Sequence, residues 1–200
     1  MKQPHVIGLS SYGGGGKTTL TRYLAATLKA TVLFWDDYDE AGLMIHPKDW
    51  RSWLTEGADN NAWKVPQLAK DLAQLKQGQS IVSPLHGSSI VPTNYIVFDA
   101  PLGYAQQETG KYIDTLVFID TPLDVAMARR ILRDYFSDAA VLEKRAANLK
   151  AEMESYLEFS RDAYLNMDKT IKPYADLILD GLLPVAVLAE KVIGHISSKL

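Results

Sequence analysis

Five short runs of consecutive apolar residues, separated by longer segments that suit helices, constrain the fold of this 200-residue chain more than any other feature. The runs cover residues 5–9, 31–35, 95–98, 115–119 and 175–179. Continuous apolar runs are typical of strands covered on both faces, and parallel strands need long crossovers, usually helices, between them. The alternation therefore predicts an α/β fold, a three-layer sandwich around a mostly parallel five-stranded sheet.

Helices are indicated between and after these runs, for example by the Thr-Pro start signal at residues 121–122. The predicted helices cover residues 20–29, 122–136, 138–169 (one long helix or two consecutive ones) and 185–197. Residues 38–66 lack such a pattern and predict an irregular lobe over the sheet edge. This lobe holds Trp50, Trp53 and Trp63, whose rings we expect to pack on one another.

Composition narrows the class of protein. Apolar residues make up 47% of the chain, which suits a sizeable core and argues against a disordered chain. No uncharged apolar run approaches the ~18 residues of a transmembrane helix, and a net charge of −3 offers no basic surplus for DNA or RNA. The absence of cysteine excludes disulfides and fits a reducing, cytoplasmic location. We expect a single domain over residues 1–200 with a small-molecule partner, no nucleic acid and no membrane; no feature predicts an oligomeric state.

A glycine-rich loop, Ser11-Tyr12-Gly13-Gly14-Gly15-Gly16-Lys17-Thr18-Thr19, joins the first predicted strand to the first predicted helix. This is the context of a P-loop, whose backbone N–H groups and following helix bind phosphates. We expect Gly13, Gly14, Gly15 and Gly16 to form the cradle, with Lys17 on the β- and γ-phosphates, Thr18 on Mg²⁺ and Thr19 on the α-phosphate. The alternative is a flexible loop that merely precedes a lysine. Ser11 stands where the motif has its first glycine, which leaves the exact shape of the loop open.

Acidic residues follow two of the predicted strands. Asp36 and Asp37 come after the second strand, and Asp99 ends the third. Because the carboxyl ends of parallel strands face the ligand crevice, a carboxylate there can accept a proton from an attacking hydroxyl. We predict this role for the Asp36-Asp37 pair and a magnesium role for Asp99, which follows four apolar residues as in a Walker B strand. The alternatives are acids that cap a loop or simply end a strand.

Arg129 and Arg133 lie four residues apart in the helix predicted after the fourth strand, so they share one helix face. Two guanidinium groups on one side suit a lid that closes over a transferring phosphoryl group. Arg130 is expected to point elsewhere and to form a surface ion pair. The alternative for the whole stretch is a solvated helix face.

Together, the Gly-Lys-Thr-Thr loop at 16–19, Asp36-Asp37-Tyr38 and the Arg-Arg-Ile-Leu-Arg-Asp stretch at 129–134 resemble the uridine kinase and phosphoribulokinase family of P-loop small-molecule kinases, which includes nicotinamide riboside kinases. Residues 68–84 are similar to the family's helix and substrate hairpin, and residues 171–178 to its final strand. The resemblance implies a P-loop kinase fold that uses ATP and Mg²⁺, with a substrate lobe over about 38–93 and a lid over about 122–145.

The same resemblance implies roles for single residues. Asp36 would be the general base, with Asp37 as the runner-up for that role and a substrate contact. Asp59 would bind ribose hydroxyls, His86 would contact the nucleoside, and Asp180 would lie near the adenine. Lys17, Arg129 and Arg133 would stabilise the phosphoryl oxygens.

Two departures from the family concern the acceptor. The Arg-Gly-Arg stretch that often follows the lid helix is replaced by residues 135–138, and Leu85 rather than a tyrosine follows Pro84. We therefore expect ATP-dependent phosphorylation of a hydroxyl on a nucleoside- or sugar-like molecule, without naming it. A guanine-binding Asn-Lys-x-Asp motif and a transporter signature are both missing from the sequence. The alternatives are an assembly or regulatory module that hydrolyses ATP without an acceptor, and a kinase of another acceptor class, such as adenylylsulfate, pantothenate or shikimate kinases.

Overall fold

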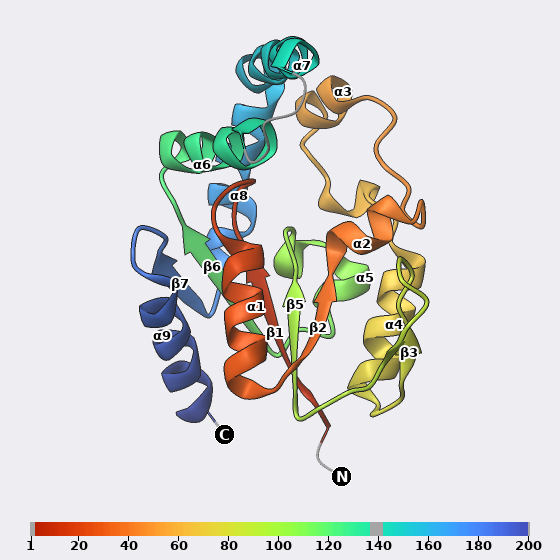
Figure 1. Cartoon of the computed structure of the whole chain (residues 1–200). Coiled ribbons are helices and arrows are strands. Elements are labelled where there is room, and N and C mark those ends of the chain that lie inside the picture. The colour runs from red at the N-terminus through yellow and green to blue at the C-terminus, as the bar shows by residue number, and fades with distance from the viewer. Residues whose placement is uncertain (1–2, 137–141, 200) are drawn as a thin grey trace.

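A central parallel sheet organises the structure, a computed structural model that describes residues 3–136 and 142–199. Its strand order in that part of the chain is β2-β5-β1-β6-β7, and each neighbouring pair is parallel (Figure 1). The strands are β1 (His5–Ser10), β2 (Thr31–Phe34), β5 (Tyr95–Asp99), β6 (Thr115–Asp120) and β7 (Leu177–Asp180). The predicted five-stranded parallel sheet is confirmed, although the second strand ends one residue early and the last begins two residues late.

Both faces of the sheet are buried, as the continuous apolar runs predict. Successive side chains of a strand point to opposite faces, so Val6 packs into one core cluster and Ile7 into the other. The helices α1 (Lys17–Leu28) and α9 (Val185–Ser197) cover the Ile7 face, and α4 (Pro66–Lys76) covers part of the Val6 face. Each fully buried leucine or isoleucine contributes roughly 1.5–3 kcal/mol. The result is the three-layer sandwich that the sequence predicts.

The segment between β2 and β5 lies over the β2 edge of the sheet (Figure 1). It contains α2 (Trp35–Glu40), α3 (Trp50–Thr55), α4 and a small antiparallel hairpin of β3 (Ile81–Val82) and β4 (Ser89–Ile90); α5 (Gln107–Gly110) follows β5. The sequence predicts residues 38–66 as irregular, whereas the structure shows the end of α2, the whole of α3 and a 3-10 helix over Asn60–Ala62 there. The start signal of α3 is Asp49, whose carboxylate accepts a hydrogen bond from the Ser52 N–H at 2.8 Å.

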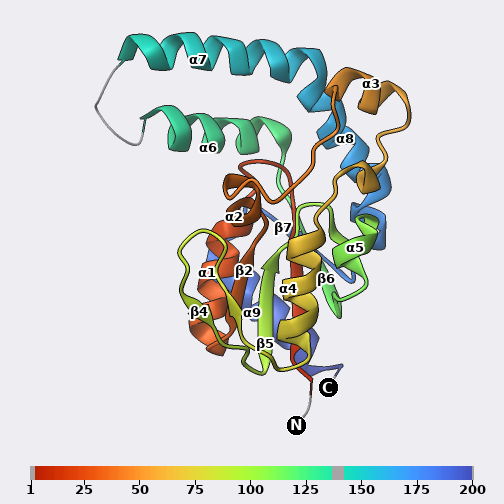
Figure 2. The ribbon, with the colours of Figure 1, turned by 90° about the vertical axis from the view of Figure 1, so that its right-hand side faces the viewer.

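Two helices extend away from the sheet as an antiparallel pair, α6 (Leu123–Phe136) and α7 (Leu142–Ser155) (Figure 2). A π-helical turn over residues 156–160 continues α7 into α8 (Arg161–Thr170). The predicted helical stretch 138–169 is therefore helical from residue 142 onward; its first four residues, and residues 137–141 of the predicted lid, lie outside the described residues. Within the described ranges, no helix is long and apolar enough to cross a membrane.

Candidate active site

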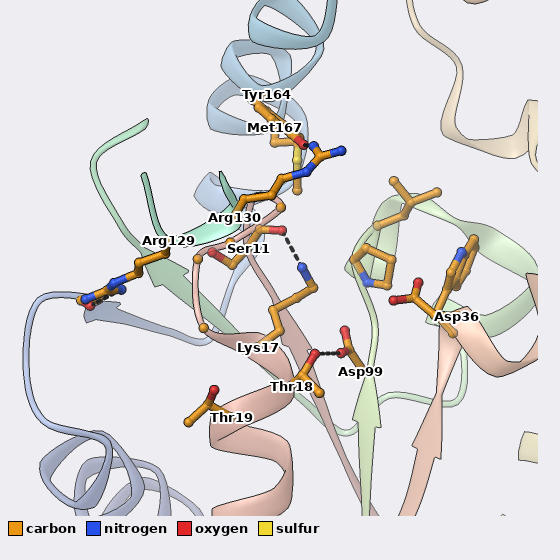
Figure 3. A pocket seen from close by; sticks show the side chains of 18 of the residues that line it. Ser11, Lys17, Thr18, Thr19, Asp36, Asp99, Arg129, Arg130, Tyr164 and Met167 are labelled. Atoms are coloured by element: carbon orange, nitrogen blue, oxygen red, sulfur yellow. Dashed lines mark hydrogen bonds between the residues drawn. The ribbon is translucent and has the colours of Figure 1, made fainter. Parts of the chain in front are cut away.

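The carboxyl ends of the strands open into a cavity of about 990 Å³. Its wall combines the glycine loop with residues of α1, α2, α3, α6, α8 and the β7–α9 connection (Figure 3). This volume lies at the upper end of the usual range for small-molecule sites. The cavity is therefore large enough for two small ligands side by side.

The glycine loop requires glycine at several positions. Gly14 and Gly16 have φ values of +84° and +101°, which side-chain-bearing residues rarely adopt. A Cβ at Gly14 would also lie 2.1 Å from the carbonyl oxygen of Ala126 on α6, and one at Gly13 would lie 2.6 Å from the Tyr164 hydroxyl on α8. The loop backbone thus lies directly beneath α6 and α8.

Ser11, which replaces the first glycine of the P-loop motif, is almost fully buried. Its hydroxyl donates a hydrogen bond to the carbonyl oxygen of Ile119 in β6 at 2.7 Å. The side chain therefore stays inside the protein and ties the loop to the neighbouring strand. Beside Ser11, the loop lines the cavity with Gly13, Gly14, Gly15 and Gly16.

Lys17, Thr18 and Thr19 begin α1 and line the cavity beside the loop. The Lys17 ammonium donates to the carbonyl oxygens of Ser11 at 3.0 Å and Tyr12 at 3.3 Å. The α1 N-terminus adds free backbone N–H groups and a positive dipole end. Backbone donors, dipole and ammonium together make this end of the cavity attractive to an anion.

Asp99 ends β5 and accepts a hydrogen bond from the Thr18 hydroxyl at 3.2 Å. It is only 5% exposed, and this burial raises the pKa of its carboxyl, an effect that nearby Lys17 partly opposes and Asp36 reinforces. The described residues contain no cluster of three or more acidic or histidine side chains suited to a metal. The hydroxyl and carboxylate oxygens of this pair are nonetheless the kind of hard ligand that Mg²⁺ takes when phosphate and water supply the remainder.

Asp36 and Asp37 both lie in the first turn of α2, but only Asp36 lines the cavity. Figure 3 shows its carboxylate directed toward the space in front of Lys17 and Asp99. Asp37 is half-buried, and burial raises the pKa of its carboxyl, with His86 lowering it and Glu40 and Asp36 raising it further. The two acids of the predicted pair thus occupy different environments.

Arg129 and Arg133 of α6 reach different partners at the edge of the cavity. The Arg129 guanidinium donates to the carbonyl oxygen of Gly181 at 3.1 Å, on the opposite side of the cavity from Asp36 (Figure 3). Arg133 also lines the cavity and pairs with Asp134, which together with Asp36 raises the pKa of its guanidinium.

The expected ion pair of Arg130 is present, but the expectation that it points away from the site is wrong, because its side chain lines the cavity above the glycine loop (Figure 3). It donates to the Tyr164 hydroxyl at 2.9 Å and forms an ion pair with Glu152 of α7 at 2.8 Å. The place of Arg130 in the cavity wall follows from a contact in space rather than from the sequence. The helix α6 contacts the loop through Ala126, and Arg130 lies one helical turn after Ala126.

Besides Asp37, three residues singled out in the sequence are not among those that line the cavity. Asp59 caps a turn by accepting from the Asn61 N–H at 2.9 Å, His86 is exposed in the β3–β4 hairpin, and Asp180 accepts from the Leu182 N–H at 3.0 Å. Neighbours of two of them, Asn60 and Gly181, do line it.

Sequence reasoning missed several lining residues. All four tryptophans of the chain line the cavity, Trp50, Trp53 and Trp63 from the lobe and Trp35 from α2. On the opposite side, the apolar residues Leu183, Val185 and Leu188 line the cavity. The helix α8 adds Tyr164 and Met167. The expected packing of the lobe rings on one another is confirmed. Their position in the wall of the cavity was not predicted.

The sheet order divides the cavity into two sides. The glycine loop follows the central strand β1, whereas Asp36 follows β2 at one edge and Gly181 follows β7 at the other. We call these the β2 side and the β7 side. The β7 side combines apolar side chains with Arg129. The β2 side holds indole rings, the acids Asp36 and Asp39, and Arg22, whose guanidinium lies 5.8 Å from the centre of the Phe34 ring at the end of β2. An anion bound at the loop would therefore lie between two chemically different compartments.

Comparison with known proteins identifies relatives over nearly the whole chain. The sequence model of the phosphoribulokinase / uridine kinase family matches residues 6–187. The chain is 30% identical over 195 residues to a uridine kinase of Borrelia duttonii, covering 87% of this chain and 85% of that one. It is 27% identical over 192 residues to a uridine kinase of Brevibacillus brevis, covering 90% and 86%. The solved deoxyadenosine kinase of M. mycoides, with dCMP and dCDP bound, has a TM-score of 0.52 at 14% identity and coverages of 96% and 99%, a likeness of fold alone.

Proposed function

Because the chain belongs to the phosphoribulokinase / uridine kinase family, we propose that it transfers the γ-phosphoryl group of ATP to a hydroxyl of a nucleoside- or sugar-like small molecule. One observation carries this proposal: Asp36 lines the same cavity as the glycine loop and Lys17, on the β2 side of the loop. A base and a phosphate cradle that share one cavity are what phosphoryl transfer to an alcohol requires.

The donor half of the proposal rests on the loop and the β7 side. Glycine N–H groups and Lys17 would hold the β- and γ-phosphates, with Thr19 beside the α-phosphate. The apolar side chains of Leu183, Val185 and Leu188 offer contacts for the adenine ring. The carboxylate of Asp99 and the hydroxyl of Thr18 would hold Mg²⁺, which when bound neutralises phosphate charge.

The acceptor half rests on the β2 side. Asp36 would accept the proton of the attacking hydroxyl as the bond from that oxygen to phosphorus forms and the bond to the leaving oxygen of ADP breaks. Lys17, Arg130 and Arg133 would stabilise the phosphoryl oxygens, and Arg129 would act nearer the nucleotide base. Since the transition state is loose, positioning and charge supply most of the catalysis.

Consumption of ATP with and without a panel of nucleosides, sugars and vitamins, with detection of the phosphorylated product by mass, tests the proposal. Stimulation by one acceptor together with its phosphorylated mass is the expected result. Hydrolysis of ATP that no acceptor stimulates would favour the alternative of a regulatory or assembly module. Lys17→Ala should weaken both nucleotide binding and transfer in the same assay.

A further inference from the structure

On the basis of the proposed function, we infer that Glu152 of α7 is a positioning residue, which holds Arg130 above the glycine loop where its guanidinium meets the γ-phosphoryl group. The inference goes beyond the proposed reaction, because no side chain of α7 that the structure describes lines the cavity. It assigns to α7 an effect on the transfer that acts through one ion pair.

The Glu152 carboxylate faces α6, and both of its oxygens have a partner there. Oε1 lies 2.8 Å from Nε of Arg130, and Oε2 accepts a hydrogen bond from the Tyr135 hydroxyl at 2.5 Å. Only 18% of the side chain is exposed, and Oε1 itself is shielded from solvent. A shielded carboxylate oxygen is costly without a cation beside it, so this position of Glu152 depends on Arg130.

Arg130 has a second support on α8. Its Nη1 atom donates to the Tyr164 hydroxyl at 2.9 Å. The Tyr164 ring in turn packs against Tyr12 of the glycine loop, with ring centroids 5.8 Å apart. The guanidinium is therefore held at two of its three nitrogens, by α7 at Nε and by α8 at Nη1.

These two supports keep the guanidinium over the glycine loop (Figure 3). A Cβ at Gly13 would lie 3.4 Å from Nη1 of Arg130, and one at Gly14 would lie 3.1 Å from the Arg130 Cβ, so the side chain runs directly above the loop backbone. The contacts of Arg130 with the described residues engage Nε and Nη1. Both N–H groups of Nη2 are therefore left for phosphoryl oxygens.

The other two α6 arginines of the cavity wall are held differently. Arg129 donates to the neutral carbonyl group of Gly181, and Arg133 pairs with Asp134, its own neighbour in α6. Among the described residues, Arg130 is the one of the three that forms an ion pair with another helix. A long arginine side chain loses rotamer freedom when it is fixed on a phosphate. A support that is in place before the nucleotide binds removes this cost from the transfer step.

The opposite role, in which Glu152 competes with phosphate for Arg130, predicts the reverse effects. Removal of the carboxylate would then tighten ATP binding and would leave kcat unchanged or raise it. The position of Arg130 directly above the loop favours the positioning role.

Steady-state kinetics of Glu152→Ala and Glu152→Gln test the inference. Glu154→Gln is the matched control, because Glu154 lies on the same helix, is 66% exposed and pairs with Lys150. We expect Glu152→Ala to lower kcat on the order of 10-fold, while KM for the acceptor changes less than about 2-fold. Glu152→Gln should recover part of the loss, since its amide oxygen can still face Nε without the charge. An unchanged or raised kcat in Glu152→Ala would overturn the inference.

The Arg130→Ala background separates positioning from a merely structural role. If Glu152 acts through Arg130, then Glu152→Ala lowers kcat no further once the guanidinium is absent. The same loss of kcat in both backgrounds would show that Glu152 acts by another route and would overturn the inference.

Titration with Mg·ATP and Mg·ADP gives a readout that needs no acceptor. Because Arg130 is assigned to the γ-phosphoryl group, Glu152→Ala should weaken ATP binding more than ADP binding, relative to the parent protein. Equal weakening, or tighter binding of ATP, would overturn the inference while the kinase function stands. Failure of the parent protein to phosphorylate any acceptor would count against the proposed function, and the two titrations would still decide the role of Glu152.

Discussion

The Oγ atom of Ser11 lies 1.8 Å from the position that a Cβ at Gly15 would occupy. The two residues are therefore complementary: the serine that replaces the first glycine of the P-loop motif fills space that only a glycine at position 15 leaves free. The same serine hydroxyl is held by the Ile119 carbonyl oxygen, so it cannot move aside without losing a buried hydrogen bond.

Gly15→Ala should therefore damage the loop, and Ser11→Gly should partly rescue it. We expect Gly15→Ala to weaken ATP binding on the order of 10-fold or more, and the double variant to recover part of this, since the clash with Ser11 is removed. Full recovery is not expected, because the new Cβ would still lie 3.1 Å from the Tyr12 carbonyl oxygen. Calorimetric titration of all four proteins measures the coupling, and strict additivity of the two substitutions would contradict it.

Asp36→Asn should reduce turnover by ~10²-fold or more while ATP affinity stays nearly unchanged. The physical reason is that the amide cannot accept the proton of the acceptor hydroxyl, whereas its size and position in α2 are the same. Asp37→Asn is the matched control, since Asp37 is the neighbouring acid that does not line the cavity. A larger loss of turnover in Asp37→Asn than in Asp36→Asn would transfer the role of the base to Asp37.

Asp99→Asn should stabilise the nucleotide-free protein at neutral pH and impair magnesium-dependent nucleotide binding. Burial raises the pKa of Asp99 above its unfolded value. As pH rises from the unfolded pKa through the folded pKa, the unfolded state releases this proton first, so folding stability falls over that window and remains lower above it. Asparagine does not ionise, so the folding stability of the variant does not fall for this reason.

Thermal melts from about pH 4 to pH 8 check the sign, because one pKa unit corresponds to about 1.4 kcal/mol and 1 kcal/mol shifts Tm by roughly 2–4 °C in a chain of this size. The Tm difference between variant and parent should grow as pH rises and vanish at the acid end. An unchanged difference across the range would contradict the assigned burial effect. Titration of Mg·ATP on the same two proteins should show weaker binding to the variant.

Arg129→Ala and Arg130→Ala should separate nucleotide binding from transfer. Arg129 reaches the Gly181 carbonyl oxygen on the β7 side, so its loss should mainly raise KM for ATP. Arg130 lies above the glycine loop, and its loss should lower kcat by roughly 10-fold or more. Initial-rate measurements over both substrates distinguish the two, and identical kinetic profiles would reject the division.

Nucleotide should order the helix that carries these arginines. Phosphate bound at the loop would attract Lys17 and the arginines of α6 toward one anion, so we expect hydrogen-exchange protection of residues 129–136 to increase when ATP is added. Peptides from β1 and β5 serve as the internal reference, because both strands lie in the middle of the sheet. Equal protection of residues 129–136 in both states would argue against a lid that closes over nucleotide.

The sequence was sufficient for the sheet and the phosphate loop because both depend on local patterns. Continuous apolar runs identify strands buried on both faces, and Gly-Lys-Thr-Thr after the first of them identifies the loop. The orientation of Arg130 was not predictable, since it depends on the rotation of α6 against Gly14, a contact between residues distant in sequence.

The position of the tryptophans in the cavity also depends on long-range folding, so it could not be predicted from the sequence. Their spacing indicates only that the rings pack together, whereas their place in the cavity depends on how residues 41–65 fold back over the edge of the sheet. The roles of Asp59, His86 and Asp180 rest on resemblance to the family, and they remain predictions. Their side chains do not line the cavity, although Asn60 and Gly181 beside two of them do.

The central position of β1 has an evolutionary consequence. Since the glycine loop stands between two sides of the cavity whose linings come largely from different stretches of the chain, we expect substitutions in residues 35–63 to alter mainly the β2 side. On the proposed function, a lineage of such proteins could change its acceptor through these residues while the β7 side stayed under constant selection. The same division makes this stretch a natural unit for transplantation between related enzymes.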